Sequence, residues 1–156
     1  MPQLSLLTPL GALTLSEEDG AIVALDWGRG RDQAETPVLL AAREQLQDYF
    51  DGQRLAFDLP LAPFGSAYQR RVWAALQQIP PGETRSYGEI ARGLGSVARA
   101  VGQANGANPI PIIIPCHRVV ASGGRLGGYS GGEGLATKTY LLELERRAGR
   151  QQGTQP

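Results

Sequence analysis

The 156-residue sequence contains one cysteine and one histidine, and the two are adjacent, as Cys116 and His117. A thiolate is a strong, soft nucleophile, and an imidazole often moves protons near neutral pH. Neighbouring side chains of an extended backbone point to opposite sides, so His117 reaches the thiol proton directly only if the chain turns here; otherwise a bridging water must carry it. An acid that steadies the imidazole completes such a group, and Glu145 is the candidate. The alternatives left open are a small buried cysteine, an ordinary histidine and a solvated glutamate.

The numbers of these residues also limit the chemistry. One cysteine excludes an internal disulfide, and one cysteine with one histidine excludes the usual Cys/His zinc site. We therefore expect no structural metal. No apolar run approaches the roughly 20 residues that span a bilayer, and the N-terminus lacks the basic start of a signal peptide. We expect a cytoplasmic protein with no membrane attachment.

The segments on either side of Cys116 predict how the sulfur is held. Ile112–Ile114 predict a buried strand, which Pro115 ends because proline lacks a backbone donor and biases the residue before it toward an extended conformation. The sulfur is then presented at a strand end, which suits a reactive group. Residues 121–134 form a loop with seven glycines, and an apolar stripe predicts a last helix over about 135–147.

Two short helices are predicted before this segment. Ser86-Tyr87-Gly88-Glu89 has the form of a capping box that opens the first, and Ser96 can cap the second, over Val97–Asn105. This is the outline of a helix-turn-helix. The second helix is rich in small residues, so its backbone can approach a groove closely. Arg99 near its start is a phosphate contact, a wedge in a base stack or a solvated surface residue.

The first half of the chain predicts a small mixed domain. Alternating residues around Leu4–Leu15 and Ala21–Trp27 predict a β-hairpin or small meander. Thr36 can cap a following helix whose first turn begins with Pro37. A short strand is expected over Leu55–Leu59.

Two prolines, Pro60 and Pro63, mark the expected boundary between domains 1–62 and 63–150, with residues 151–156 as a flexible tail. The halves differ in charge. The first holds four arginines against ten acidic residues, a net charge of −6, and the second eleven basic residues against five glutamates, a net charge of +6. A basic half suggests contact with a polyanion, and a chance asymmetry is the alternative.

Several motifs together resemble one family. Pro115-Cys116-His117-Arg118-Val119-Val120 closely resembles the active-site hexapeptide of the O6-alkylguanine-DNA alkyltransferases. Segments 85–91, 98–102, 108–109 and 128–132 are similar to other motifs of that family, in the family's order. The resemblance covers about 60 to 147 well, whereas the first domain is less distinctive.

The resemblance implies an α/β (α+β) fold: a small ribonuclease-H-like N-terminal domain and a mainly helical, winged-helix-like C-terminal domain with a helix-turn-helix. It also implies DNA repair by irreversible transfer of an alkyl group from O6-alkylguanine, and also from O4-alkylthymine, to Cys116. One turnover per molecule and no cofactor are expected. His117 and an ordered water would connect Cys116 to Glu145, which makes a thiolate available near neutral pH. Asn108 would brace the turn that carries the cysteine, and Tyr87 would rotate the lesion outward and protonate the leaving base.

Further residues follow from the same resemblance. The partner would be double-stranded DNA with an alkylated guanine, bound through the minor groove by a monomer, and Arg99 would fill the place that the base vacates. Zinc ligands that some relatives possess have no counterpart here. Apart from the resemblance, we interpret Trp27 and Trp73 as core or interface anchors with no catalytic role. The expected substrate contacts are Pro111, Val119, Tyr129, Ser130, Gly131 and Lys138, and the expected DNA contacts are Ser86, Tyr87, Ala98 and Arg99.

Three other functions remain open. A non-catalytic lesion binder keeps the helix-turn-helix but replaces the cysteine, which this chain retains. A transcription regulator would use the same helices, yet no additional sensor domain or second cysteine supports it. A cysteine hydrolase turns over repeatedly. Counting the label that each protein molecule takes up from labelled methylated DNA separates all three alternatives from a single-turnover transferase.

Overall fold

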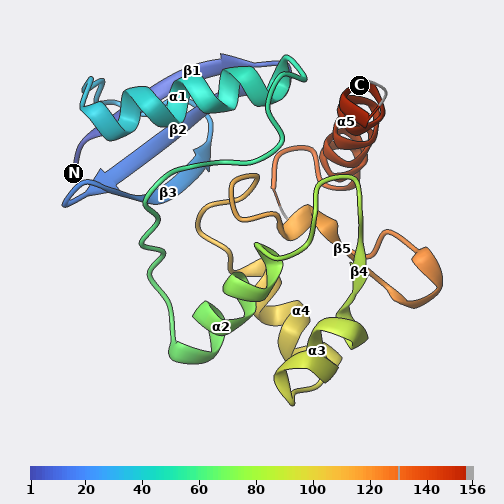
Figure 1. The fold of residues 1–156 in the computed structure, drawn as a ribbon. Coiled ribbons are helices and arrows are strands. Elements are labelled where there is room, and N and C mark those ends of the chain that lie inside the picture. Colours follow the sequence, from blue (N-terminus) through green and yellow to red (C-terminus); the bar gives the residue numbers. More distant parts are fainter. Residues whose placement is uncertain (130, 154–156) are drawn as a thin grey trace.

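The computed structural model describes the backbone of residues 1–129 and 131–153, and side chains as far as residue 150. The chain begins with an antiparallel sheet in the order β1-β2-β3, formed by Gln3–Thr8, Gly11–Glu18 and Ala21–Trp27. Helix α1, Pro37–Phe50, runs along this sheet (Figure 1). The Thr36 hydroxyl accepts a hydrogen bond from the Leu39 backbone at 3.3 Å. The predictions of a meander and of this helix cap are confirmed.

The strand expected over Leu55–Leu59 was wrong. This linker pairs with β3 at one place only, an isolated parallel bridge between Ile22 and Leu61. The Ile22 backbone donates to the Pro60 carbonyl and accepts from the Ala62 amide, both at 2.8 Å. Pro60 offers a carbonyl but no N–H, so a continuous ladder cannot extend through it.

The second half is mainly helical. A short parallel pair, β4 with β5, joins the segment before the helix-turn-helix to the segment after Cys116 (Figure 1). The elements in order are α2 (Ala67–Leu76), β4 (Arg85–Ser86), α3 (Tyr87–Leu94), α4 (Ala98–Gly106), the 3-10 turn Cys116–Arg118, β5 (Val119–Val120), a second 3-10 turn Ser122–Gly124, and α5 (Leu135–Gly153).

The helix-turn-helix consists of α3 and α4. The predicted capping box opens α3, with the Ser86 hydroxyl and the Glu89 carboxylate each accepting from the other's backbone at 3.1 Å. Gly95 ends α3 at φ 65°, a left-handed conformation that glycine adopts without strain. The expected cap of α4 by Ser96 was wrong. The cap residue is Val97, whose apolar side chain cannot make a cap bond. The Ser96 hydroxyl pairs instead with the Tyr68 hydroxyl at 2.7 Å.

The isoleucine run before Cys116 is buried, as predicted, but it is not a strand. Ile112 has a φ of 75°, and the Ile114 amide donates to the Ile110 carbonyl at 2.9 Å, so the chain folds into a tight turn. Pro109, Pro111 and Pro115 have no backbone N–H, so this segment lacks three of the donors that a β-ladder would use.

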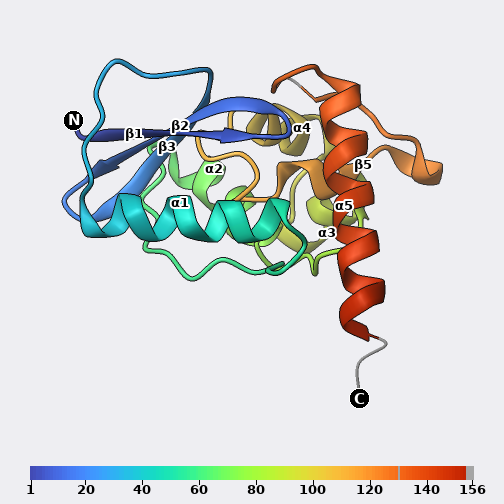
Figure 2. The same ribbon diagram turned by 90° about the horizontal axis from the view of Figure 1, so that it is seen from above.

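The two halves of the chain share one apolar core. Side chains from the sheet, α1, α2 and the isoleucine turn belong to a single buried cluster. Figure 2 shows α5 standing across the end of α1, so the last helix meets the first. The Trp73 indole on α2 donates to the Ala104 carbonyl on α4 at 2.8 Å, which ties the helix-turn-helix to the core. Among the described helices, none is both long and apolar enough to cross a bilayer. The domain boundary at residues 62–63 stays a prediction.

Candidate active site at Cys116

Cys116 begins a 3-10 turn directly after Pro115 and is 6% exposed. The chain therefore turns at the cysteine, and the geometry of an extended pair does not apply to Cys116 and His117. Asn108 holds the preceding turn together. Its side-chain amide donates to the Ile114 carbonyl at 2.8 Å, and its side-chain oxygen accepts from the Ile110 amide at 3.0 Å.

Behind the cysteine lies a fully buried ionic cluster centred on Glu145. One ring nitrogen of His117, Nε2, lies 2.7 Å from the carboxylate, and the other, Nδ1, is buried without a partner among the described residues. Arg118 donates to both carboxylate oxygens at 2.9 Å and to the Ile79 carbonyl at 2.7 Å. The Tyr49 hydroxyl of α1 donates to the same carboxylate at 2.7 Å.

The sequence reasoning did not assign Arg118 or Tyr49 to this cluster. Arg118 lies in the hexapeptide, next to His117. A buried relay acid needs a positively charged partner, so this arginine was the available signal. Tyr49 lies 96 residues from Glu145 along the chain, and no local pattern marks it. Arg118 donates to Oε1, which His117 leaves free, and Tyr49 and Arg118 both donate to Oε2, which His117 also contacts.

The electrostatics of the cluster favour an ionised Glu145. Burial alone would raise the pKa of this carboxyl, but its interactions with His117 and Arg118 outweigh burial and hold the pKa far below the usual range. Burial first, and then Glu145 itself, raises the pKa of Tyr49, so its hydroxyl stays a donor. Glu145 therefore accepts hydrogen bonds from all three partners.

The cysteine itself has the opposite tendency. Burial raises the pKa of the Cys116 thiol, although the side chain of Asn108 and the charge of Lys138 oppose the shift. A raised pKa favours the neutral thiol in the free protein. That the His117–Glu145 pair makes a thiolate available stays a prediction.

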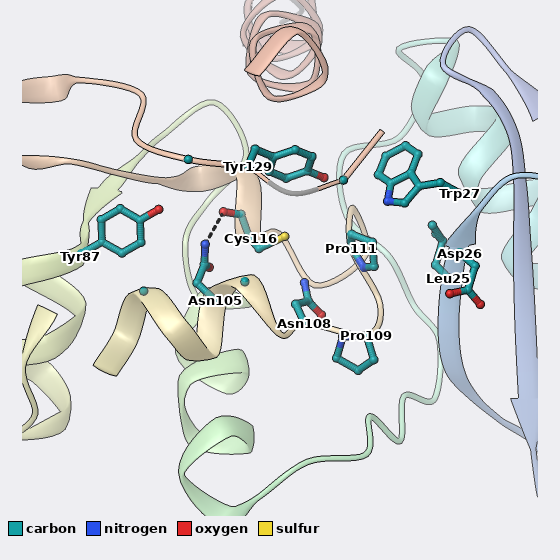
Figure 3. Close-up of a pocket in the computed structure, with 14 residues that line it drawn as sticks. Leu25, Asp26, Trp27, Tyr87, Asn105, Asn108, Pro109, Pro111, Cys116 and Tyr129 are labelled. Atoms are coloured by element: carbon teal, nitrogen blue, oxygen red, sulfur yellow. Dashed lines mark hydrogen bonds between the residues drawn. The ribbon is translucent and has the colours of Figure 1, made fainter. Parts of the chain in front are cut away.

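A cavity of about 540 Å³ opens in front of the sulfur (Figure 3). Tyr87 lies at one end, and the Cys116 sulfur points away from it, toward the side where Pro111 and Trp27 lie. The lining residues are Leu25, Asp26, Trp27, Tyr87, Gly102, Asn105, Gly106, Asn108, Pro109, Pro111, Cys116, Gly128, Tyr129 and Gly131.

Tyr87 begins α3 and is half-buried beside the cavity. Glycines border its ring, since a Cβ on Gly127 would approach it to 3.2 Å and one on Gly102 to 3.9 Å. Burial, and then the charge of Cys116, raise the pKa of Tyr87, against a hydrogen bond from Asn105. The phenol is therefore protonated at neutral pH and can donate.

Asn105 was missed by the sequence reasoning. Its amide donates to the Cys116 carbonyl at 3.3 Å, and its buried side-chain oxygen has no partner among the described residues. It stands near the end of the helix that carries Gly102 and Gly106, both in the cavity wall. A buried asparagine on an otherwise small-residue helix was the available signal.

Lys138 and Val119 do not line the cavity, although both were expected there. Lys138 is fully buried and donates to the carbonyls of Val119 at 2.7 Å, of Gly128 at 3.2 Å and of Leu126. Val119 is held in β5. Lys138 therefore holds the glycine-rich loop in place from α5, through its hydrogen bonds to the loop carbonyls. Ser130 lies outside the described residues.

The residues expected to meet DNA lie on the helix-turn-helix. Ala98 and Arg99 are exposed in the first turn of α4. The Ser86 hydroxyl is engaged in capping α3, so it offers a second contact only through its remaining hydrogen-bond capacity. Gly102 and Gly106 on the same helix border the cavity, which joins the exposed face of α4 to the pocket.

Two family models match this chain in order. The ribonuclease-like domain of 6-O-methylguanine DNA methyltransferase matches residues 5–63, and the DNA binding domain of the same family matches residues 67–147. The constitutive methylated-DNA--protein-cysteine methyltransferase of Bacillus subtilis is 45% identical over 152 residues, covering 89% of this chain and 92% of that protein. A methylated-DNA--protein-cysteine methyltransferase of Mycolicibacterium paratuberculosis is 49% identical over 152 residues, covering 90% of this chain and 89% of that protein.

Solved structures agree with these relatives. The crystal structure of Mycobacterium tuberculosis OGT in complex with DNA has a TM-score of 0.85 and 44% identity, covering 95% of this chain and 94% of that one. An O6-methylguanine DNA methyltransferase from Methanococcus jannaschii has a TM-score of 0.67 and 29% identity, covering 92% and 93%. Both domain models match, and the similarity to these relatives extends along nearly the whole length, so this chain belongs to the O6-methylguanine DNA methyltransferase family.

Proposed function

We propose that this protein repairs DNA by transferring the alkyl group of O6-alkylguanine, and of O4-alkylthymine, to the sulfur of Cys116, once per molecule. The observation that carries the proposal is the position of the cysteine: it lies in a cavity bordered on one side by the helix-turn-helix and backed by the His117–Glu145 pair. The relatives named as methylated-DNA--protein-cysteine methyltransferases support it. No cofactor takes part.

The bond changes balance within the protein and the substrate. The Cys116 sulfur bonds to the alkyl carbon while the bond from that carbon to the guanine oxygen breaks. The thiol proton passes to His117, and the leaving base takes a proton from the Tyr87 hydroxyl. The proton on His117 then returns to Tyr87 through solvent. The thioether product has no easy exit, so the protein is used up.

The proton path follows from the two ring nitrogens of His117. Nε2 lies against the ionised Glu145 and carries a proton toward it, which leaves Nδ1 as the acceptor. Because burial favours the neutral thiol, Nδ1 removes its proton as the sulfur attacks, through a bridging water. Glu145 stabilises the imidazolium that forms.

DNA binding is assigned to α3 and α4 of the basic half, residues 63–150. Small residues on α4 allow close approach to the minor groove, and Arg99 fills the space that the rotated nucleotide leaves. Residues 1–62 form the other domain. We propose that the protein acts in the cytoplasm. It acts as a monomer, since one chain contains every residue that the reaction uses.

The test counts transferred groups. The protein is incubated with duplex DNA that contains one labelled O6-methylguanine. Intact-mass spectrometry counts the transferred groups, and mass spectrometry of the digested protein locates them. We expect at most one methyl group per chain, on Cys116, and no transfer by Cys116→Ser, which still binds the lesion. Release of free methyl product with repeated turnover supports a hydrolase instead. Lesion binding by the wild type without any transfer supports a non-catalytic binder or a regulator.

A further inference from the structure

The N-terminal domain supplies part of the cavity wall. The end of strand β3 contributes Leu25, Asp26 and Trp27 to the lining, on the side opposite Tyr87 (Figure 3). The net charge of this domain is negative, and these three wall residues take no part in the proposed proton path or in the expected DNA contacts. The contacts of Leu25, Asp26 and Trp27 therefore have to indicate what this part of the wall does.

Strand β3 is attached to both sides of the cavity. The Leu25 amide donates to the Pro109 carbonyl at 2.9 Å, which fixes the strand to the turn that precedes the cysteine. On the other side, the Trp27 indole packs against the glycine-rich loop: a Cβ on Gly131 would lie 2.7 Å from it, and one on Gly132 would lie 3.2 Å away. The wall is therefore held in position, and glycine is required at Gly131 for the indole to fit.

The direction of the reaction decides which part of a substrate meets this wall. A nucleotide rotated out of a duplex on the α3–α4 face enters past Tyr87 and Gly102, so its base occupies that end of the cavity. The sulfur attacks from the middle and points toward Pro111 and Trp27 (Figure 3). With the base at the Tyr87 end, the part of the cavity left for any O6 substituent beyond the reacting carbon lies on the side of β3.

The cavity as a whole is large enough for a base that carries a group larger than methyl. Pockets of about 300 to 1,000 Å³ enclose drug-sized molecules, and this cavity has a volume of about 540 Å³. The wall that such a group meets combines the apolar Trp27 with the exposed carboxylate of Asp26. An indole favours an apolar chain through buried area, and a carboxylate disfavours an anionic one.

From this arrangement we infer that the end of β3 determines which O6 substituents are accepted: Trp27 favours extended neutral chains, and Asp26 disfavours anionic ones. The inference rests on the proposed function and adds the N-terminal domain as its specificity element. A methyl group does not extend beyond the reacting carbon, so its transfer serves as the reference rate.

The test compares single-turnover rates on duplexes that contain O6-methyl-, O6-butyl- or O6-carboxymethylguanine. Trp27→Ala should lower the ratio of the butyl to the methyl rate about tenfold, the scale at which a pocket senses a methylene, and Trp27→Phe should restore most of it. Asp26→Asn should raise the carboxymethyl-to-methyl ratio about threefold, the size of an exposed charge effect. Leu7→Ala, on the exposed edge of the same sheet at 78% exposure, is the control and should change neither ratio.

The outcomes separate the inference from the function on which it rests. If the wild type does not transfer methyl, the proposed function fails. If the wild type does transfer methyl, the inference is overturned when Trp27→Ala leaves the butyl-to-methyl ratio unchanged or Asp26→Asn leaves the carboxymethyl-to-methyl ratio unchanged. This includes the case in which Trp27→Ala slows transfer of methyl and of butyl equally because the loop has moved. Asp26 is exposed, so Asp26→Asn folds and decides the matter even if Trp27→Ala does not.

Discussion

Replacement of Glu145 by glutamine should destabilise the protein and slow transfer together. The carboxylate accepts hydrogen bonds from Tyr49, His117 and Arg118 at 2.7 to 2.9 Å. Its side chain is fully buried, and that of Arg118 is 6% exposed, so solvent screens their interaction little. Removing one partner of a buried ion pair costs about 3–5 kcal/mol, since the other charge stays buried alone. We expect Glu145→Gln to lower the free energy of unfolding by about that amount.

Urea unfolding followed by tryptophan fluorescence measures this change, because Trp73 is buried in the core beside α4. Tyr49→Phe is the matched variant: it removes one donor but leaves the ion pair, and should cost about 1–2 kcal/mol. A loss below about 1 kcal/mol for Glu145→Gln would refute the reasoning, because it would mean that Arg118 finds another partner or is solvated.

The same pair predicts a pH dependence with a definite sign. The pKa of Glu145 is held below its unfolded value, so its contribution to stability is fully present above about pH 5 and decreases as the pH falls below about 4. The difference in unfolding free energy between wild type and Glu145→Gln should therefore be constant near neutral pH and narrow in acid. A difference that widens in acid contradicts the assignment of Glu145 as the ionised partner.

Three further predictions concern the cysteine, the tyrosine and the loop. Burial raises the pKa of the Cys116 thiol above its ordinary value, so iodoacetamide should alkylate Cys116 of the free protein more slowly than it alkylates glutathione at pH 7.5. The rate should rise through pH 9, and alkylation faster than that of glutathione would show a preformed thiolate. Tyr87→Phe should slow single-turnover transfer about a hundredfold, the scale of a lost general acid, while affinity for the lesion duplex changes less than twofold; an equal loss of both assigns Tyr87 to binding alone. Lys138→Met removes the donor to the carbonyls of Val119, Leu126 and Gly128, and should lower the free energy of unfolding by about 2–4 kcal/mol in urea titrations; no loss would mean that the loop does not depend on the buried ammonium.

Features set by neighbouring residues could be predicted from the sequence. The Thr36 and Ser86 caps bond to backbone groups three residues away, so a short pattern contains all that forms them. Ser96 has the same local chemistry, yet its hydroxyl pairs with Tyr68 on another helix. A tertiary partner therefore outcompeted a local cap, and the pattern alone does not reveal which partner is nearer.

The isoleucine run shows a different limit. Apolar composition predicted burial, which is correct, but burial does not specify a strand, because a turn and a strand can bury the same side chains. The prolines in the run decided between them by removing ladder donors. The candidate site divides in the same way: Cys116 and His117 are adjacent in sequence, whereas Tyr49 reaches Glu145 from 96 residues away.

The N-terminal domain enters the site at two places, and both have a physical reason. Glu145 is buried with more hydrogen-bonding capacity than His117 alone satisfies, so Tyr49 at the end of α1 supplies a donor that a helical C-terminal domain does not place there. The cavity in front of Cys116 would be open on the side away from Tyr87 without β3, which closes it through Leu25 and Trp27. An acidic domain would weaken binding to DNA if it faced the phosphates. Its contacts place it behind the relay and beyond the sulfur, where its negative charge is compatible with a basic half that binds DNA.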